Sequence, residues 1–248
     1  MYLTLMFLGA IFLPVPALIR AIRKHKAPYR AVFEGIIAGG AGALLVMILA
    51  SASGVSIFDT IINSVKPLAQ ALAEDSNLAQ RMEPGMSEQE MVGFVISIYE
   101  AAASLLPASI CIITACVSYM EYIILSRIVR KDGVEGLPMD KFRNFELPGN
   151  TVIGWLILFA LAWIISKTGI VNGEMLFANI NTLFNFIFCL QGMSLLFMLC
   201  YIKRAPKGIA VIIILFLMFS SIGKMVLMIL GFADLIFRLK EKMRRTVI

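Results

Sequence analysis

Amide side chains recur within one apolar stretch of the C-terminal half. Asn181, Asn185, Phe188 and Gly192 follow one another at steps of four, three and four, so they share one face of a helix, while Gln191 lies elsewhere around it. Amides in such a segment can hydrogen-bond a polar solute, or they can bond across helices where a glycine lets two backbones approach. The spacing therefore leaves two interpretations open: ligand binding by the amides, and helix packing at the glycine.

A second polar stripe lies in an earlier apolar stretch, at Thr114, Ser118 and Glu121. A carboxylate and a serine hydroxyl on one helix face could form a cation or proton site, or part of a ligand site, together with polar groups of another span. The alternative is that Glu121 extends along the helix toward Arg127 at the membrane surface.

Other residues of the apolar segments have packing or interface roles available to them. Gly35 and Gly39 form a GxxxG pair, which favours close contact between helices. Trp155 is expected either to stack on a bound solute or to anchor its helix at the membrane surface. Asp234 and Arg238 are four residues apart, so they can pair along a helix.

The composition identifies the environment in which these residues act. Of the 248 residues, 60% are hydrophobic and 15% are charged, and the mean hydropathy is +0.88. Soluble domains are about 45–50% apolar and about 25% charged. The chain is therefore an integral membrane protein, which excludes a cytosolic enzyme, a nucleic-acid-binding domain and a disulfide-rich secreted scaffold. It contains no HExxH, GxSxG or P-loop motif, so we expect no enzyme.

The cysteines and the histidine do not form a metal-binding pattern. All four cysteines lie in apolar stretches without a CxxC pair, and His25 is the single histidine. Cysteines in such positions usually act as small apolar residues. We expect no metal site and no cofactor.

The apolar segments define an expected architecture. A spanning helix needs about 20 mostly apolar residues. We expect an all-α, polytopic transmembrane bundle of about six spans in a single domain, residues 1–248, with the spans near 1–19, 31–57, 105–129, 150–166, 175–202 and 209–237. Arginines and lysines follow the first apolar run, which favours a retained span over a signal peptide.

The charges of the connecting segments predict the orientation. Four basic clusters, near residues 20–30, 127–143, 203–207 and 238–245, should be cytoplasmic, because basic connecting segments favour that side of the membrane. Segment 58–104 should lie outside, because from Asp59 to Glu90 it has six carboxylates and only two basic residues.

Segment 58–104 should itself form two amphipathic outer helices. Ile61, Val65, Leu68 and Leu72 make an apolar stripe, and Ser87 with Glu90 has the form of a capping box. These helices could lie on the membrane face as an ordinary hairpin or cover a cavity as a lid. Asn150 is expected to cap the fourth span.

The last apolar segment, 209–237, allows two topologies. One tilted helix would place the basic tail outside the cell. This would break the charge rule, by which basic connecting segments lie on the cytoplasmic side. The polar run from Ser220 to Lys224 would instead permit a broken or re-entrant pair, which returns the tail to the cytoplasm.

Several short motifs resemble the YybS-type family of uncharacterised bacterial membrane proteins. They are Phe145-Glu146-Leu147-Pro148 before a tryptophan-containing span, Gln191-Gly192 in a late span, Gly231-Phe232-Ala233-Asp234 followed by Arg238, and an early Leu13-Pro14-Val15-Pro16. The likeness covers most of the chain. That family is distantly similar to the substrate-binding S components of energy-coupling-factor transporters and to the rod-shape protein MreD.

The resemblance implies two functions. In the first, the protein is a small-molecule binding or transport subunit that works with a separate ATPase, and its solute contacts Asn181, Asn185, Gln191 and Trp155 beneath the outer helices. In the second, it is a non-catalytic scaffold of a cell-envelope or division assembly, and the same residues are helix contacts. Both imply the lipid bilayer as a partner, a multi-pass location in the bacterial cytoplasmic membrane, and no nucleic acid.

Overall fold

Helices make up every regular element that the structure describes. The structure is a computed structural model that describes residues 1–74, 87–131, 138–169 and 172–246. The chain divides into two compact units, Met1–Leu137 and Pro138–Ile248, each described here by itself. The expected single domain stays a prediction.

Six apolar segments stand close to the six expected spans, which confirms the all-α bundle within the described residues. Four are long and apolar enough to cross a membrane: Tyr2–Arg23, Pro28–Ala52, Leu106–Arg130 and Gly173–Ile202. A shorter apolar helix, Thr151–Lys167, and a bent pair, Lys207–Phe219 with Ser221–Phe237, complete the set.

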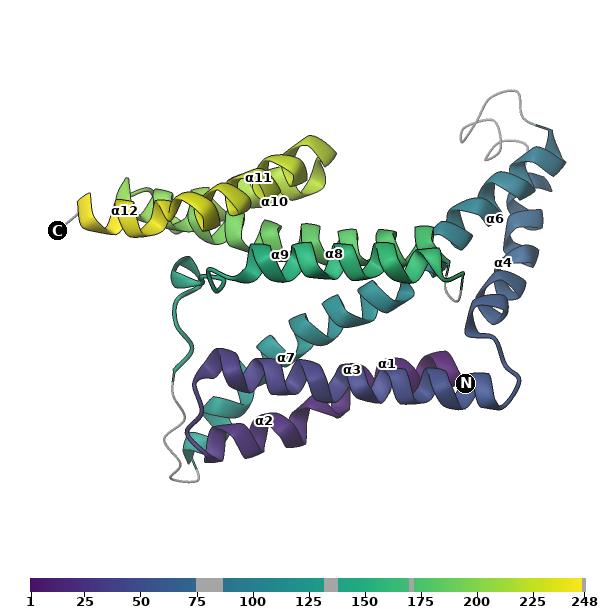
Figure 1. The fold of residues 1–248 in the computed structure, drawn as a ribbon, viewed down its shortest axis with the longest axis horizontal. Helices are drawn as coiled ribbons and strands as arrows, with labels where there is room; N and C mark the ends of the chain where they lie inside the picture. The colour runs from purple at the N-terminus through teal and green to yellow at the C-terminus, as the bar shows by residue number, and fades with distance from the viewer. Residues whose placement is uncertain (75–86, 132–137, 170–171, 247–248) are drawn as a thin grey trace. The chain divides into compact units, whose positions relative to one another are not determined.

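The first unit is built on three membrane segments (Figure 1). The first consists of α1 (Tyr2–Phe12) and α2 (Pro14–Arg23), which are separated at Leu13 because the next residue, Pro14, has no amide hydrogen to continue the helix. Helices α3 (Pro28–Ala52) and α7 (Leu106–Lys131) pack against both. Their shared core includes Met6, Ala10, Ala43 and Ile110.

Glycines on α3 allow this close packing. A Cβ atom at Gly39 would lie 2.5 Å from Thr114 Cγ2 and 3.1 Å from the backbone oxygen of Ala10. At Gly35 it would lie 3.0 Å from Ser118 Oγ. The GxxxG pair therefore faces α7 and the first membrane segment, and larger side chains there would force the helices apart.

The two outer helices are present, as α4 (Ile57–Glu74) and α6 (Glu88–Ser104); residues 75–86 between them lie outside the described part. The capping box is confirmed, since Ser87 Oγ accepts from the Glu90 amide and Glu90 accepts from the Ser87 amide at 2.9 Å. The hydrogen bond from the Ser87 amide, together with one from the Ser87 hydroxyl at 2.7 Å, lowers the pKa of the Glu90 carboxyl.

The apolar stripe expected on α4 is confirmed at Val65, with Ile61 and Leu72 packed against the same cluster, and is wrong at Leu68. The buried face is Ile62, Val65, Ala69 and Ala73, whereas Leu68 is exposed. The alanines let Met91 and Val95 of α6 approach closely, and together they form a separate apolar cluster with Val65. A lid role for this hairpin stays a prediction.

The second unit is arranged around α9 (Gly173–Ile202). Helix α8 (Thr151–Lys167) packs on one side of it, and α10 (Lys207–Phe219) and α11 (Ser221–Phe237) pack on others. Asn150 occupies the N-cap position of α8, but its side chain makes no capping hydrogen bond. The side chain of Asn172 does cap α9, accepting from the Met175 amide at 3.1 Å.

The last apolar segment is a bent pair and not one continuous tilted helix. Helices α10 and α11 meet at an angle of 116° at Ser220, and Figure 1 shows them doubling back. Ser220 caps α11 by accepting from the Gly223 amide at 3.1 Å. A Cβ at Gly223 would lie 2.2 Å from the Leu217 backbone oxygen, so the bend requires glycine there.

The bend returns the tail to the end of the unit from which α10 starts. The short helix α12 (Leu239–Thr246) contacts the loop before α8 through an Arg244–Glu146 ion pair of 3.3 Å. The same loop contacts the C-terminal part of α9, where the Arg143 guanidinium lies 3.5 Å from the centre of the Tyr201 ring. Three basic segments of this unit thus share one end, as the charge rule requires.

We therefore expect the C-terminus and the 203–206 connection to lie on the same, cytoplasmic side. A fluorescent-protein fusion at the C-terminus should fluoresce, because this reporter folds only in the cytoplasm, and so should a fusion truncated after Ala205. Matching alkaline phosphatase fusions should be inactive. An active phosphatase at the C-terminus alone would contradict the bent pair and restore the single span.

Candidate functional site

Four buried polar residues meet near one end of the second unit. Gln191 and Ser194 come from α9, Asp234 from the last turn of α11, and Lys240 from the first turn of α12. Their exposed fractions are only 2%, 0%, 3% and 1%, respectively. We call them the buried polar cluster. Polar groups removed from water need partners, and these four residues find them in one another and in the backbone of the loop before α8.

Asp234 is the centre of the cluster. Its carboxylate accepts from Gln191 Nε2 at 2.6 Å and from the Lys240 backbone amide at 2.9 Å, and the Lys240 ammonium lies 3.4 Å away. The chain can turn back in this way because Arg238 adopts a left-handed conformation, with φ of 49°, between the two helices. The carboxylate thereby also satisfies a free amide at the start of α12.

Lys240 connects the cluster to the loop of residues 142–149. Its ammonium donates to Ser194 Oγ at 2.9 Å and to the Phe145 backbone oxygen. Ser194 Oγ in turn donates to the Phe142 backbone oxygen at 2.7 Å. Burial lowers the pKa of Lys240, and the neighbouring Asp234 carboxylate opposes that shift.

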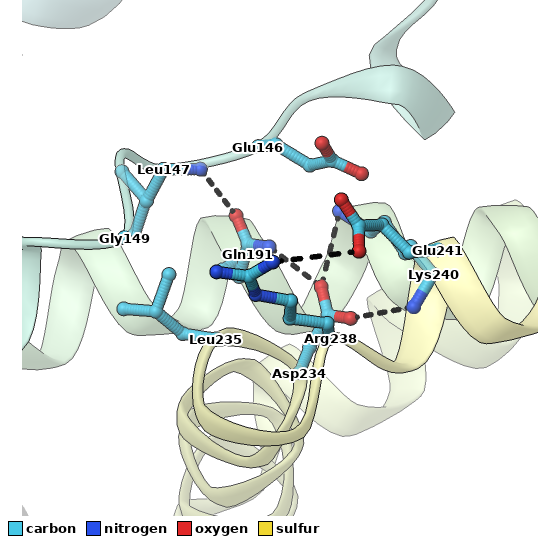
Figure 2. A pocket seen from close by; sticks show the side chains of 9 residues that line it. All are labelled: Glu146, Leu147, Gly149, Gln191, Asp234, Leu235, Arg238, Lys240 and Glu241. Carbon is cyan, nitrogen blue, oxygen red and sulfur yellow. Dashed lines mark hydrogen bonds and ion pairs between the residues drawn. The ribbon is translucent and has the colours of Figure 1, made fainter.

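Gln191 holds the other side of the same loop. Its side-chain oxygen accepts from the Leu147 amide at 3.1 Å, while its nitrogen donates to Asp234. One amide thus joins the loop, α9 and α11, and Figure 2 shows this chain of hydrogen bonds.

A pocket of about 260 Å³ opens beside the cluster. Figure 2 shows its nine lining residues: Glu146, Leu147, Gly149, Gln191, Asp234, Leu235, Arg238, Lys240 and Glu241. Its lining carries charges of both signs: Arg238 lies 3.9 Å from Glu241, and Glu146 pairs at 3.3 Å with Arg244 outside the lining. Such a lining can bind a small solute that carries both donors and acceptors.

No group of three His, Cys, Asp or Glu side chains in the described residues is arranged to hold a metal ion. Arg238 and Lys240 line the same pocket as the carboxylates. Their positive charges compensate the negative charge that would otherwise attract a metal cation.

The expected ligand residues of α9 do not all lie at the pocket. Gln191 lines the pocket, but Asn181 is exposed, Asn185 is half-buried, and neither lines it. At 1.5 Å per residue, Asn181 lies about 15 Å from Gln191 along the helix. Gly192 contacts α11, where an added Cβ would lie 2.0 Å from the Leu227 backbone oxygen. Solute binding by the two asparagines stays a prediction.

Trp155 lies in an aromatic cluster rather than in the pocket. Its ring centre is 5.6 Å from that of Phe184 and 6.3 Å from that of Phe159, and the residue is only 8% exposed. The cluster continues through Phe188 to Phe232 of α11. These contacts support packing of α8 on α9, and the burial does not suit an anchor at the membrane surface.

Ser118 and Glu121 belong to the first unit. Ser118 Oγ, Thr114 Oγ1 and Glu121 Oε2 are buried without a hydrogen-bond partner among the described residues, and no Glu121–Arg127 ion pair forms within that part. A hollow shared with the amides of α9 would have to combine the two units, so it stays a prediction.

The expected pairing of Asp234 with Arg238 is wrong. Asp234 pairs with Lys240, and Arg238 pairs with Glu241. Helix α11 ends at Phe237, so the spacing of four residues no longer brings the two side chains together. Sequence reasoning also missed Ser194 and Glu146. The sequence signal that could have found this site is the set of motifs resembling the YybS-type family. Three of these motifs lie at the site: Phe145–Pro148, Gln191-Gly192 and Gly231–Asp234.

Comparison with known proteins agrees with that resemblance. A family described as "Predicted membrane protein (DUF2232)" matches residues 2–235. The chain belongs to this family. It is also 22% identical over 229 residues to the uncharacterised protein YybS of Bacillus subtilis (strain 168), covering 89% of this chain and 71% of that protein. No solved structure matches it.

Proposed function

We propose that this family member is a small-molecule binding subunit of a transport system in the bacterial cytoplasmic membrane. It would bind a small polar solute in the pocket beside the buried polar cluster, without catalysing a reaction. Any ATP hydrolysis would come from a separate protein, because the sequence has no P-loop.

The pocket lining is the observation that carries this proposal. The lining combines the amide of Gln191 and the carboxylate of Asp234 with the charged side chains of Arg238, Glu146 and Glu241. Its volume of about 260 Å³ is below the roughly 300–1,000 Å³ that drug-sized ligands occupy. A small zwitterionic solute, with one positive and one negative group, fits this size and charge pattern.

Replacing Arg238 with asparagine tests the proposal. Asparagine tolerates the left-handed conformation of this position, so the backbone turn should persist while the pocket loses its guanidinium. Mass spectrometry of the purified wild-type protein should detect a co-purifying polar metabolite. That metabolite should stabilise the wild type thermally and bind the variant at least tenfold more weakly.

Arg204→Asn is the matched control. Arg204 is also an arginine with positive φ, at 54°, but it lies in the connection between α9 and α10 and does not line the pocket. This variant should keep wild-type binding. Equal binding by wild type and Arg238→Asn, or no bound metabolite in any preparation, would reject the pocket as a solute site.

A non-catalytic scaffold of a cell-envelope or division assembly is the second candidate. It is favoured by the use of Gln191 and Gly192 in contacts between helices and to a loop. Co-purification separates the two functions. An ATPase with its membrane coupler supports transport, whereas cell-wall or division proteins without a metabolite support the scaffold.

A further inference from the structure

Helix α2 has one face packed into the first unit. Pro14, Leu18, Ala21 and Ile22 are buried there, and α2 contacts α3 and α7. A helix this short, 10 residues, is held in a defined rotation by such contacts. The direction in which its remaining side chains point is therefore fixed.

The other face of α2 carries an open, shallow depression of about 570 Å³, which we call the α2 groove. It is apolar toward the start of the helix and cationic toward its end. Its lining residues are Val15, Pro16, Ile19, Arg20, Arg23 and Lys24. The three cationic residues are exposed. Apolar side chains followed by positive charges on one helix face match an amphiphile with an anionic head.

Among the described residues the cations of the groove form no ion pair, although the charge of Lys24 acts on the Glu34 carboxylate. The nearby carboxylate of Glu34 pairs with Lys26 and Arg30. The groove therefore retains a net positive charge that an external anion can meet.

We propose that the α2 groove binds an anionic diacyl phospholipid. Its phosphate would lie between Arg20 and Arg23, because guanidinium groups bind phosphate oxygens in pairs. An acyl chain would run along Val15 and Ile19. The groove lies at the basic end of the span Tyr2–Arg23, which the charge rule places in the anionic cytoplasmic leaflet. A free phosphate ion would contact only the cationic half of the α2 groove. This site is independent of the solute pocket.

Native mass spectrometry of the full-length protein tests this proposal. The protein in detergent is titrated with dioleoyl phosphatidylglycerol, dioleoyl phosphatidylcholine or glycerol phosphate. We expect tight binding of phosphatidylglycerol only. Arg20→Gln/Arg23→Gln should weaken it roughly 30-fold, since each basic residue near an anionic lipid contributes about 1 kcal/mol. Ile19→Gln should weaken it several-fold by disturbing the acyl-chain contact.

Arg127→Gln/Arg130→Gln is the control, because it removes the same charge from exposed positions at the basic end of α7. It should leave phosphatidylglycerol binding unchanged. Equal losses in both double variants would reduce the effect to general charge attraction and overturn the site. Equal binding of glycerol phosphate, or an Ile19→Gln variant that binds like wild type, would overturn a lipid as the occupant. Circular dichroism checks that each variant is folded.

Discussion

Replacing Asp234 with alanine should destabilise the protein by about 3–5 kcal/mol, which is typical when one partner of a buried ion pair is removed. The change removes the ion-pair partner of the Lys240 ammonium at a position only 1% exposed. It also removes the acceptor for Gln191 Nε2 and for the Lys240 amide. Reversible unfolding of the full-length protein in mixed micelles measures the change in free energy.

A double substitution separates the charge effect from lost packing. Lys240→Met alone should also destabilise, because Asp234 then becomes the unpaired charge. Asp234→Leu/Lys240→Met should cost less than either single change, since no isolated charge remains buried.

The exposed pair of Arg238 and Glu241 provides the control for this prediction. Their side chains are 74% and 48% exposed and lie 3.9 Å apart, so Glu241→Ala should change stability by less than about 1 kcal/mol. If Asp234→Ala destabilised the protein as little as Glu241→Ala does, the buried pair would not hold the site together.

Alanine at Gly192 or Gly231 should separate α9 from α11. The new Cβ would lie 2.0 Å from the Leu227 backbone oxygen in the first case and 2.0 Å from the Phe188 backbone oxygen in the second. Backbone atoms cannot rotate away as a flexible side chain can, so the helices must move. We expect a loss of about 3 kcal/mol or more for each variant, at the upper end of overpacking effects.

Gly154→Ala is the matched control, since it lies inside α8 with no atom within 4 Å of the added Cβ. Alanine there should be neutral or stabilising by up to about 1 kcal/mol. The double variant Gly192→Ala/Gly231→Ala should lose less than the sum of the single losses, because one separation relieves both clashes. Full additivity, measured by the same unfolding experiment, would contradict a shared contact.

Several features follow from sequence because they depend on local or periodic patterns. The apolar segments and the all-α class could be predicted from run lengths alone. The capping box at Ser87 and Glu90 could be predicted because its bonds close within four residues. Gln191 could be singled out as a polar group inside a span. The apolar pattern of α4 predicted its buried face less well, because two neighbouring stripes of a helix differ by one residue. The packing of Ala69 and Ala73 against α6 decided which stripe is buried.

The site itself was decided by tertiary structure. The sequence determined that Asp234 needs a partner in an apolar setting, but its spacing pointed to Arg238. The left-handed turn at Arg238 selects Lys240 instead. The partners of Lys240 and Gln191 include backbone groups of Phe145 and Leu147, and every residue carries such groups, so no side-chain pattern identifies them. Only the packing of α9, α11 and the loop brings these donors and acceptors together, because burial makes an unpaired polar group costly wherever the chain places it.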